Sequence, residues 1–426
     1  MATEIERIVD GSVTTPKGFV AGATYVGLKT YGEAPLDLGL LMSETPAVVA
    51  GTFTTSKVRS ASVVLSERRA SSLEARGVVA NSGCANACVG DQGMKDAIEM
   101  TSLAGAKLGV SPEEVLACST GIIGVELPMG LIRSGIDKIA VSADGGHEFA
   151  RSILTTDHNT KEYTVSFLVD GVRVHIAGCT KGAGMIHPNM ATMLCFLTTD
   201  ATVEPALLSQ SLKEAVDSTF NMISVEGDTS TNDTVLLFAN GAAGAPKIDS
   251  DNASGETFRR ALFEVCRELA KAIVRGGEGA TKLIEVVVEG AQSVTDARLA
   301  ARSVASSVLV KTAIYGNDPN WGRIMMALGK SGAEMQESSM ALYINDICIM
   351  EDGLPISYFK DAVIANMNGP EIKLVAKLNI GEGSATAWGC DMSEAFVTFN
   401  SAYTCLLYTS DAADERSSVD LGGRRI

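Results

Sequence analysis

Hydrophobic and polar positions follow two different periods along this chain, which predicts strands in some segments and amphipathic helices in others. In the first 120 residues, runs rich in small and β-branched residues predict strands at AVVAGTFTT (47–55), SASVVLS (60–66) and GVVAN (77–81). Residues 93–108 are predicted to form a helix. A mixture of this kind without a strict repeat indicates the α/β class.

The clearest helical patterns come later in the chain. Residues 204–220 carry Pro205 near the predicted first turn, where a missing backbone N–H costs nothing. Residues 256–275 end before Gly276 and place a row of apolar residues along one face: Phe258, Leu262, Val265, Leu269 and Ile273. Both helices are expected to pack on a sheet.

A second, smaller α/β domain is predicted after Gly279. The segment IEVVVEG (284–290) predicts a strand, residues 296–307 a helix, and VLVKTAIYG (308–316) and IKLVAKL (372–378) further strands. We therefore divide the chain into a domain of residues 1–280 and a C-terminal α/β domain of residues 281–404.

The last 22 residues do not read as part of the fold. From Cys405 the tail CLLYTSDAADERSSVDLGGRRI is polar and aperiodic, and it follows abruptly on FVTFNSAYT (396–404), which is predicted as a strand. The start of the tail can be back-translated into a string that looks like a sequencing-library adapter. We treat residues 405–426 as a non-native tail, with a disordered natural tail as the alternative.

Composition narrows the functional classes. A net charge of −16 without any run of basic residues argues against nucleic acid as a partner. The chain has no signal-like N-terminus and no apolar stretch long enough for a membrane span, so a cytoplasmic location is expected. Most of the nine cysteines lie in apolar runs, and Cys84 and Cys88 have no second pair at zinc-site spacing. No metal site is expected.

The segment KGAGMIHPNMATMLCFLTTD (181–200) carries the most chemical information. It reads as a Gly-rich, Pro-containing loop that feeds a buried strand, with Thr192 at the junction after the small residue Ala191. If the turn is strained, the Thr192 hydroxyl can attack the carbonyl of residue 191 in an N→O acyl shift. Hydrolysis of the ester would free the α-amine of Thr192 as a base beside its own hydroxyl. An ordinary threonine at the start of a strand is the alternative from the residues alone.

Several further motifs accompany this segment in a fixed order: TPKGFVAGATYVGLK, NSGCANACVG, STGIIG, EGDTSTNDT, GGEGATK, DPNWGR and FNSAYT. Together with KGAGMIHPNMATML they cover nearly all of residues 13–404. With these motifs the chain resembles the ArgJ family, the ornithine acetyltransferases also called glutamate N-acetyltransferases.

This resemblance implies a fold and a set of catalytic residues. The implied fold is a self-processing, N-terminal-nucleophile-type layered α/β (α+β) fold of the ArgJ/DmpA superfold. Cleavage between Ala191 and Thr192 would give an α chain of residues 1–191 and a β chain of residues 192–426, with Thr192 as the nucleophile. Thr120 and Gly121, in STGIIG, match the family's oxyanion hole, where preorganised donors are worth about 3–4 kcal/mol each.

Substrate contacts are implied at Thr155, Lys181, Thr192, Glu278 and Asn400. The side-chain types suit zwitterionic amino acids, because Lys181 can hold a carboxylate and Glu278 an ammonium group. On sequence alone, a solvated surface position would be the simpler interpretation of either charge.

Two departures from the family pattern stand out. Cys405 occupies the position at which the family has Thr or Ser, so no role is transferred to it, and Cys84 stands where Asn is common.

Other kinds of site are not indicated by the sequence. Neither GCTKGAGM nor GGEGATK has the spacing of a phosphate-binding loop. The four histidines show no metal or catalytic-triad spacing, and His187 is interpreted as a turn residue.

The implied activity is ping-pong transfer of acetyl from N-acetylornithine to Thr192 and then to glutamate, within arginine biosynthesis. No cofactor is expected, although acetyl-CoA remains open as a second acetyl donor. The expected partners are these small substrates and the cleaved chains themselves, as an α2β2 assembly without nucleic acid or membrane. A self-processing aminopeptidase or amidase and a non-cleaving binding protein are the two alternatives.

Overall fold

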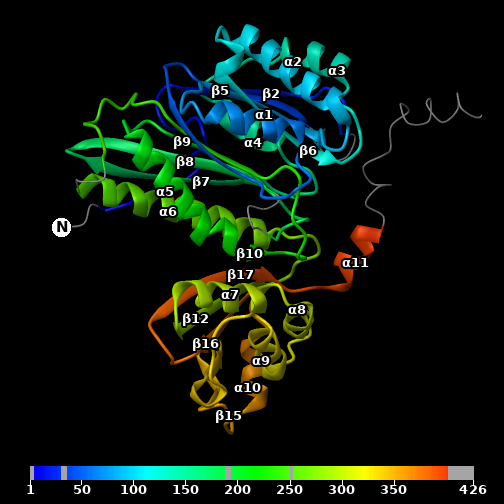
Figure 1. Ribbon diagram of the computed structural model, residues 1–426, viewed down its shortest axis with the longest axis vertical. Helices are drawn as coiled ribbons and strands as arrows, with labels where there is room; N and C mark the ends of the chain where they lie inside the picture. The colour runs from blue at the N-terminus through cyan, green and yellow to red at the C-terminus, as the bar shows by residue number, and fades with distance from the viewer. Residues whose placement is uncertain (1–3, 30–35, 188–192, 250–252, 402–426) are drawn as a thin grey trace, which may run out of the picture.

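The computed structural model describes residues 4–29, 36–187, 193–249 and 253–401. Three sheets organise the chain, and two of them pack face to face in the upper part of Figure 1. The first is a six-stranded sheet with strands in the order β1 (Glu6–Ile8), β7 (Lys161–Val169), β8 (Val172–Lys181), β9 (Leu194–Thr199), β11 (Thr234–Ala239) and β4 (Val48–Phe53). The second is four-stranded, in the order β2 (Phe19–Thr24), β3 (Leu38–Ser43), β5 (Gly77–Cys84) and β6 (Val115–Ile122).

The two sheets bury their inner faces against each other. Leu194, Phe196 and Phe238 of the six-stranded sheet share one apolar cluster with Leu41 and Leu116 of the four-stranded sheet. Strand β9 is buried at every position, since one of its faces meets the other sheet and the opposite face meets helices. The run MLCFL was therefore correctly interpreted as a buried strand.

Helices cover both outer faces of this sandwich. One layer packs on the four-stranded sheet and consists of α1 (Ala61–Ala70), α2 (Gly90–Leu108) and α3 (Met129–Ile136). The other packs on the six-stranded sheet and consists of α5 (Pro205–Ser218) and α6 (Ala253–Arg275). The short α4 (Gly146–Ser152) packs against β2 and β3. The four layers, α/β/β/α, are visible in Figure 1 and confirm the predicted layered α/β fold.

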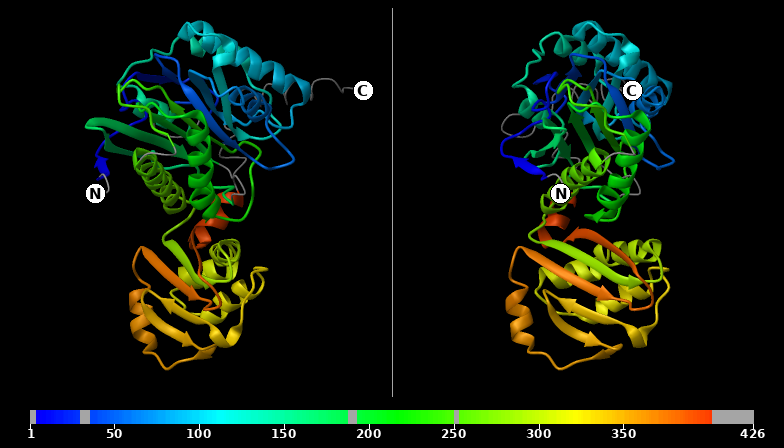
Figure 2. Two further views of the ribbon diagram at one scale, coloured as in Figure 1. Left: turned by 60° about the vertical axis from the view of Figure 1, so that its left-hand side comes forward. Right: turned by 90° about the vertical axis from the view of Figure 1, so that its left-hand side faces the viewer.

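The third sheet forms the lower part of the molecule in Figures 1 and 2. Its strands run in the order β10 (Ile223–Ser224), β17 (Gly383–Cys390), β12 (Leu283–Ala291), β16 (Glu371–Lys377), β13 (Ala341–Ile344), β14 (Ile347–Glu351) and β15 (Leu354–Pro355). The helices that follow β12 are α7 (Val294–Ala305), α8 (Val308–Tyr315), α9 (Trp321–Gly329), α10 (Lys360–Asn366) and α11 (Glu394–Ser401).

The chain crosses between the two parts of the molecule in both directions. Strand β10 precedes residue 280 yet pairs with β17 of the third sheet. Helix α11 follows the third sheet but returns to the junction, where Phe396 lies against Gly279. The return of α11 brings Asn400 back to the first part of the molecule, where it contacts Glu278.

The long amphipathic helices follow their patterns closely. Helix α5 forms where it was predicted, with Pro205 in its first turn; Glu204 is its N-cap, and the helix ends at Ser218. The apolar row of α6 is fully buried against β7 and β8. Strands β4, β5, β12 and β16 and helix α7 also form where the patterns predict them.

Three strand predictions were wrong, because each of these segments forms a helix. SASVVLS begins α1, whose N-cap Ser60 accepts a hydrogen bond from the Ser62 amide. VLVKTAIYG forms α8, capped by Ser307, and its buried residues recur at helical rather than alternating spacing. FVTFNS lies in α11, where the Thr398 hydroxyl bonds back to the carbonyl of Glu394 four residues earlier. In α1 and α8, a serine N-cap overrode the β-propensity of Val, Ile and Thr.

None of the helices in the described part of the chain is long and apolar enough to cross a membrane.

Candidate active site

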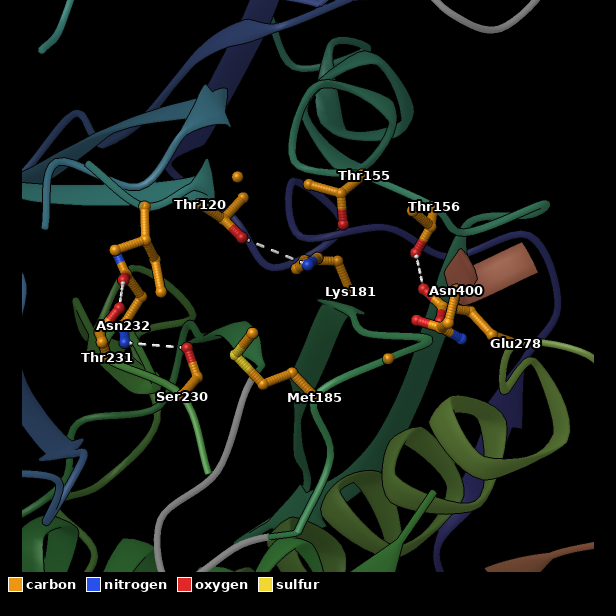
Figure 3. Close-up of a pocket in the computed structure, with 13 residues that line it drawn as sticks. Thr120, Thr155, Thr156, Lys181, Met185, Ser230, Thr231, Asn232, Glu278 and Asn400 are labelled. Atoms are coloured by element: carbon orange, nitrogen blue, oxygen red, sulfur yellow. Dashed lines mark hydrogen bonds between the residues drawn. The ribbon is translucent and has the colours of Figure 1, made fainter. Parts of the chain in front are cut away.

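A cavity of about 330 Å³ is lined by residues of the layered sandwich, of the loop between α6 and β12, and of α11 (Figure 3). It collects every predicted site residue that the structure describes: Thr120, Gly121, Thr155, Lys181, Glu278 and Asn400. These six residues come from five separate segments, so only the fold brings them together. The other lining residues are Ile123, Thr156, Gly184, Met185, Ser230, Thr231 and Asn232.

The predicted cleavage site, Ala191–Thr192, lies outside the described residues. The strands on either side of this segment are described, and they are direct neighbours in the six-stranded sheet. Lys181 at the end of β8 pairs with Leu194 at the start of β9. Lys181 lines the pocket, and its partner Leu194 follows Thr192 by two residues in the chain.

The two predicted oxyanion donors, Thr120 and Gly121, lie near the end of β6, and this part of the pocket is called the oxyanion side below. Gly121 has φ = 134°, a conformation that side chains rarely adopt. A Cβ atom there would also overlap the backbone of Gly83 on the paired strand β5. The close strand approach therefore requires glycine at this position, and it fixes the backbone beside the pocket.

Lys181 lies between Thr120 and the group around Glu278 in Figure 3. Its side chain is only 3% exposed, and its Nζ donates to Thr120 Oγ1 over 3.3 Å. Burial lowers the pKa of Lys181, while the carboxylates of Asp157 and Glu278 act in the opposite direction. Because Nζ donates to the Thr120 oxygen, the hydroxyl hydrogen of Thr120 is left to donate elsewhere.

A buried ion pair between Asp157 and Lys161 lies close to Lys181. Asp157 Oδ1 accepts from Lys161 Nζ at 2.5 Å and from the backbone N–H of Gly182 at 2.8 Å. Burial by itself would raise the pKa of Asp157, but the charges of Lys161 and Lys181 outweigh it and hold that pKa at about 2. The ionised Asp157 thus offsets part of the cost of burying two lysines.

The ionic side of the pocket is organised around Glu278, in the loop between α6 and β12. Thr156 Oγ1 donates to Glu278 Oε1 at 2.7 Å, and Asn400 Nδ2 donates to Oε2 at 3.0 Å. A carboxylate can accept about four hydrogen bonds, so both oxygens keep room for a further donor. The structure therefore orients this carboxylate with neutral groups and leaves it able to take a cation.

Sequence reasoning missed several residues of this site. Thr156, the neighbour of the predicted Thr155, is the threonine whose hydroxyl holds Glu278. Asn232 lines the pocket within EGDTSTNDT, a motif quoted above without an assigned role. The density of polar residues directly before a buried strand was the signal that could have identified this segment.

Cys84, which departs from the family pattern, ends strand β5 beside β6. Its thiol is buried, and burial raises the pKa of Cys84 to about 11, so the thiol stays neutral at physiological pH. The substitution therefore adds no charge next to Gly121. Within the described ranges, no three His, Cys, Asp or Glu side chains are grouped so that they could hold a metal ion.

Comparison with known proteins defines the family. The model of the ArgJ family matches residues 20–405. The chain belongs to the ArgJ family. A relative from Dehalococcoides mccartyi (strain CBDB1), the arginine biosynthesis bifunctional protein ArgJ, is 47% identical and aligns with 95% of this chain and 100% of its own length.

Two solved ArgJ-type structures are also similar to this chain. The arginine biosynthesis bifunctional protein ArgJ from Bacillus halodurans is 40% identical, with a TM-score of 0.48, over 49% of this chain and 98% of that chain. Ornithine acetyltransferase from Mycobacterium tuberculosis, solved in complex with ornithine, is 31% identical, with a TM-score of 0.41, over 44% of this chain and 99% of that chain.

Proposed function

We propose that this ArgJ-family chain cuts itself between Ala191 and Thr192 and then transfers acetyl from N-acetylornithine to glutamate in arginine biosynthesis. The observation that carries this proposal is a single pocket that unites Thr120 and Gly121 with a cation, Lys181, and a carboxylate, Glu278. Membership of the ArgJ family supports the same conclusion.

Self-cleavage is the first step of the proposal. The Thr192 hydroxyl attacks the carbonyl carbon of Ala191, the C–N bond to Thr192 breaks, and the acyl group moves onto the hydroxyl oxygen. Water then hydrolyses this ester, leaving a carboxylate on Ala191 and a free α-amine on Thr192. That amine has an ordinary pKa of about 7.7–8.0, which suits a base that takes the proton of the adjacent hydroxyl.

Acetyl transfer uses the same hydroxyl. Thr192 attacks the acetyl carbonyl of N-acetylornithine, and the C–N bond breaks as ornithine leaves with its amine protonated. The α-amine of glutamate then attacks the acetyl ester, which forms N-acetylglutamate and restores Thr192. In both steps the carbonyl oxygen becomes anionic, and the Thr120 hydroxyl and the Gly121 N–H are the proposed donors to it.

Charge complementarity supports these substrates. Lys181 Nζ has three donor positions, and among the described residues its hydrogen-bond partner is Thr120 Oγ1. Its remaining capacity suits a substrate carboxylate, while Glu278 suits an ammonium group. Thr155 and Asn400 are proposed to add neutral hydrogen bonds, and Asn400 does so besides holding Glu278.

The proposal also covers the assembly of the fragments, the location of the protein and its use of cofactors. Both fragments remain associated, because β8 of the first fragment pairs with β9 of the second along six residue positions. The resemblance to the ArgJ family implies that two such pairs assemble as α2β2. The location is cytoplasmic, no cofactor takes part, and acetyl-CoA is an optional donor for the same pocket.

Mass spectrometry of the purified protein tests this function. Cleavage should give fragments 1–191 and 192–426, roughly 20 and 25 kDa when scaled from the 44.5 kDa chain. After incubation with N-acetylornithine, the fragment that begins at Thr192 should gain one acetyl group, and added glutamate should remove it as N-acetylglutamate. A fully active sample that remains a single chain would refute the mechanism.

The same assay separates the alternatives. An aminopeptidase or amidase would pass the acyl group to water, so acetate would form at the same rate with or without glutamate. A binding protein would show neither fragments nor acetylation. Family membership favours the transferase.

A further inference from the structure

Two adjacent residues in front of β11, Asn232 and Asp233, take no part in the mechanism above yet are almost completely buried. Asn232 is 5% exposed and Asp233 1%. The Asn232 amide donates to two backbone carbonyls, those of Ala85 at 2.6 Å and Ser119 at 2.7 Å. Ser119 directly precedes Thr120, so this side chain braces the strand that carries the oxyanion donors.

Asp233 makes the corresponding contact on the other sheet. Its Oδ1 accepts the backbone N–H of Met193 at 2.9 Å, and the next residue, Thr234, donates its own N–H to the Met193 carbonyl at 3.0 Å. Met193 follows Thr192 in the chain. Both backbone polar groups of the residue after the predicted nucleophile are therefore held by positions 233 and 234.

Residues 230–233, which include Asn232 and Asp233, are also held by hydrogen bonds from Thr54 and Ser60. The backbone N–H of Thr54 donates to the Asp233 carbonyl, and that of Ser60 to the Thr231 carbonyl, both at 2.9 Å. The Thr54 hydroxyl donates to the Ser230 carbonyl at 2.8 Å. Residues 230–233 are thus tied to the connection between β4 and α1, which gives both side chains a rigid base.

From these contacts we infer that Asn232 and Asp233 form a clamp that sets the distance between the nucleophile and the oxyanion donors. The inference rests on the proposed function. The oxyanion donors lie in β6 of the four-stranded sheet, and Met193, the residue after the proposed nucleophile, directly precedes β9 of the six-stranded sheet. One dipeptide thus reaches both sheets, through the Asn232 bond to Ser119 and the Asp233 bond to Met193. A misplacement of about 1 Å between reacting groups can cost about 10²-fold in rate.

The two side chains suit positioning rather than proton transfer. The amide nitrogen of Asn232 offers one N–H to each of two carbonyls and does not titrate. Burial raises the pKa of the Asp233 carboxyl well above its usual range, and an oxygen of a neutral acid still accepts from the Met193 N–H. Asparagine should therefore replace Asp233 without losing that contact.

The test compares Asn232→Ala, Asp233→Ala and Asp233→Asn by their rates of self-cleavage and their kcat and KM for acetyl transfer. Asn232→Ala should lower kcat about 10–100-fold with KM within about threefold, because oxyanion donors act in the transition state. Asp233→Ala should slow cleavage and lower kcat about 100-fold, whereas Asp233→Asn should stay within about fivefold of the wild type. If Asn232→Ala does not fold, Asn232→Ser should show a smaller loss of kcat in the same direction.

Asn240→Ala is the matched control. Asn240 follows the opposite end of the same strand, β11, and its amide donates to the Lys17 carbonyl and the Ser43 hydroxyl, away from the pocket. Its kcat and KM should equal those of the wild type. The clamp is refuted if Asn232→Ala raises KM alone, as loss of a substrate contact would, or if Asp233→Asn is as damaging as Asp233→Ala.

Hydrogen exchange separates failure of the clamp from failure of the proposed function. A wild-type protein that transfers no acetyl would refute the function but would leave the contacts measurable. Asp233→Ala should then increase deuterium uptake at the start of β9, and Asn232→Ala at the end of β6, with no change in either strand for Asn240→Ala. Unchanged uptake in both strands would overturn the clamp.

Discussion

The oxyanion side and the ionic side of the pocket are built in different ways. On the oxyanion side, Thr120 and Gly121 lie near the end of β6, each residue of which pairs with β5, and this register fixes their backbone. On the ionic side, Thr156 and Glu278 lie in loops and Asn400 on the last described helix, and side-chain hydrogen bonds from Thr156 and Asn400 hold the Glu278 carboxylate.

This difference matches the two tasks in acyl transfer. Groups that stabilise a transition state need fixed geometry, which strands provide. Groups that bind a flexible substrate can lie on loops and be oriented by neighbouring side chains. Changes on the oxyanion side should therefore lower kcat, and changes on the ionic side should raise KM.

The largest effect is expected from Thr192→Ala. This variant should neither cleave nor transfer acetyl, because no hydroxyl remains for either step. Denaturing electrophoresis and the acetyl-transfer assay measure the two losses. Thr192→Ser keeps a hydroxyl and should restore both activities in part. Cleavage of the alanine variant would remove Thr192 from the mechanism.

Thr120→Ala tests the oxyanion side of the pocket. Loss of one donor is expected to lower kcat about 10²–10³-fold, with little change in KM and with folding intact. Steady-state kinetics of the processed enzyme give the two constants, and Thr120→Ser, which retains the hydroxyl, is the control. A turnover number equal to that of the wild type would exclude this hydroxyl as an oxyanion donor.

Glu278→Gln tests the ionic side. The amide keeps the shape of the side chain but loses the charge that would face a substrate ammonium group, so KM should rise about 10–100-fold. Glu256→Gln, near the other end of α6 with an exposed side chain, should leave KM unchanged. The predicted division of the pocket fails if Glu278→Gln lowers kcat and leaves KM as it was.

Gly184→Ala should disturb the ionic side more gently. A Cβ atom at Gly184 would lie 2.5 Å from Glu278 Oε1, so the carboxylate must shift from its partners Thr156 and Asn400. We expect KM to rise several-fold with kcat nearly constant. Gly130→Ala, a helical position with open space around it, is the control. Equal KM values for both variants would contradict the crowding at Gly184.

The smallest effect on activity is expected from Glu226→Gln. Glu226 contacts Ile186, the residue that follows the pocket-lining Gly184 and Met185. Glu226 Oε1 accepts from the Ile186 N–H at 2.5 Å, and burial raises the pKa of Glu226 to about 7. Because ionisation is disfavoured in the folded state, the wild type should lose stability as pH rises from about 4.5 through about 7, on the order of 3 kcal/mol.

Thermal unfolding at two pH values measures this effect. At pH 5, wild type and Glu226→Gln should have similar midpoints, whereas at pH 8.5 the variant should unfold at the higher temperature. kcat and KM of the variant at neutral pH should stay close to those of the wild type. A gap between the midpoints that is the same at both pH values would contradict the shifted ionisation.

Long, strongly periodic segments could be predicted from the sequence. The apolar row of α6 and the continuous apolar run of β9 each have one stable arrangement, burial on one face or on both. The short runs at 60–66 and 308–316 were misassigned, because a few apolar residues fit either period and a serine cap decided for helix.

The sequence by itself determined which residues carry reactive chemistry. Lys181, Thr192 and Glu278 could be named from their motifs, because family resemblance links these residue types to acyl transfer on amino acids. The layered α/β class also followed from the mixture of periods, since strands and amphipathic helices of this kind must cover one another's apolar faces.

Only the tertiary structure decided how these residues meet. Nothing local to position 156 shows that its hydroxyl holds a carboxylate 122 residues away, nor that Asn232 joins two carbonyls on another sheet. Such contacts form because burial of the apolar faces brings the strand and helix ends together, and a polar group enclosed there must find a partner. The hydrogen-bond partners of Thr156 and Asn232 therefore depend on the whole fold and not on the neighbouring sequence.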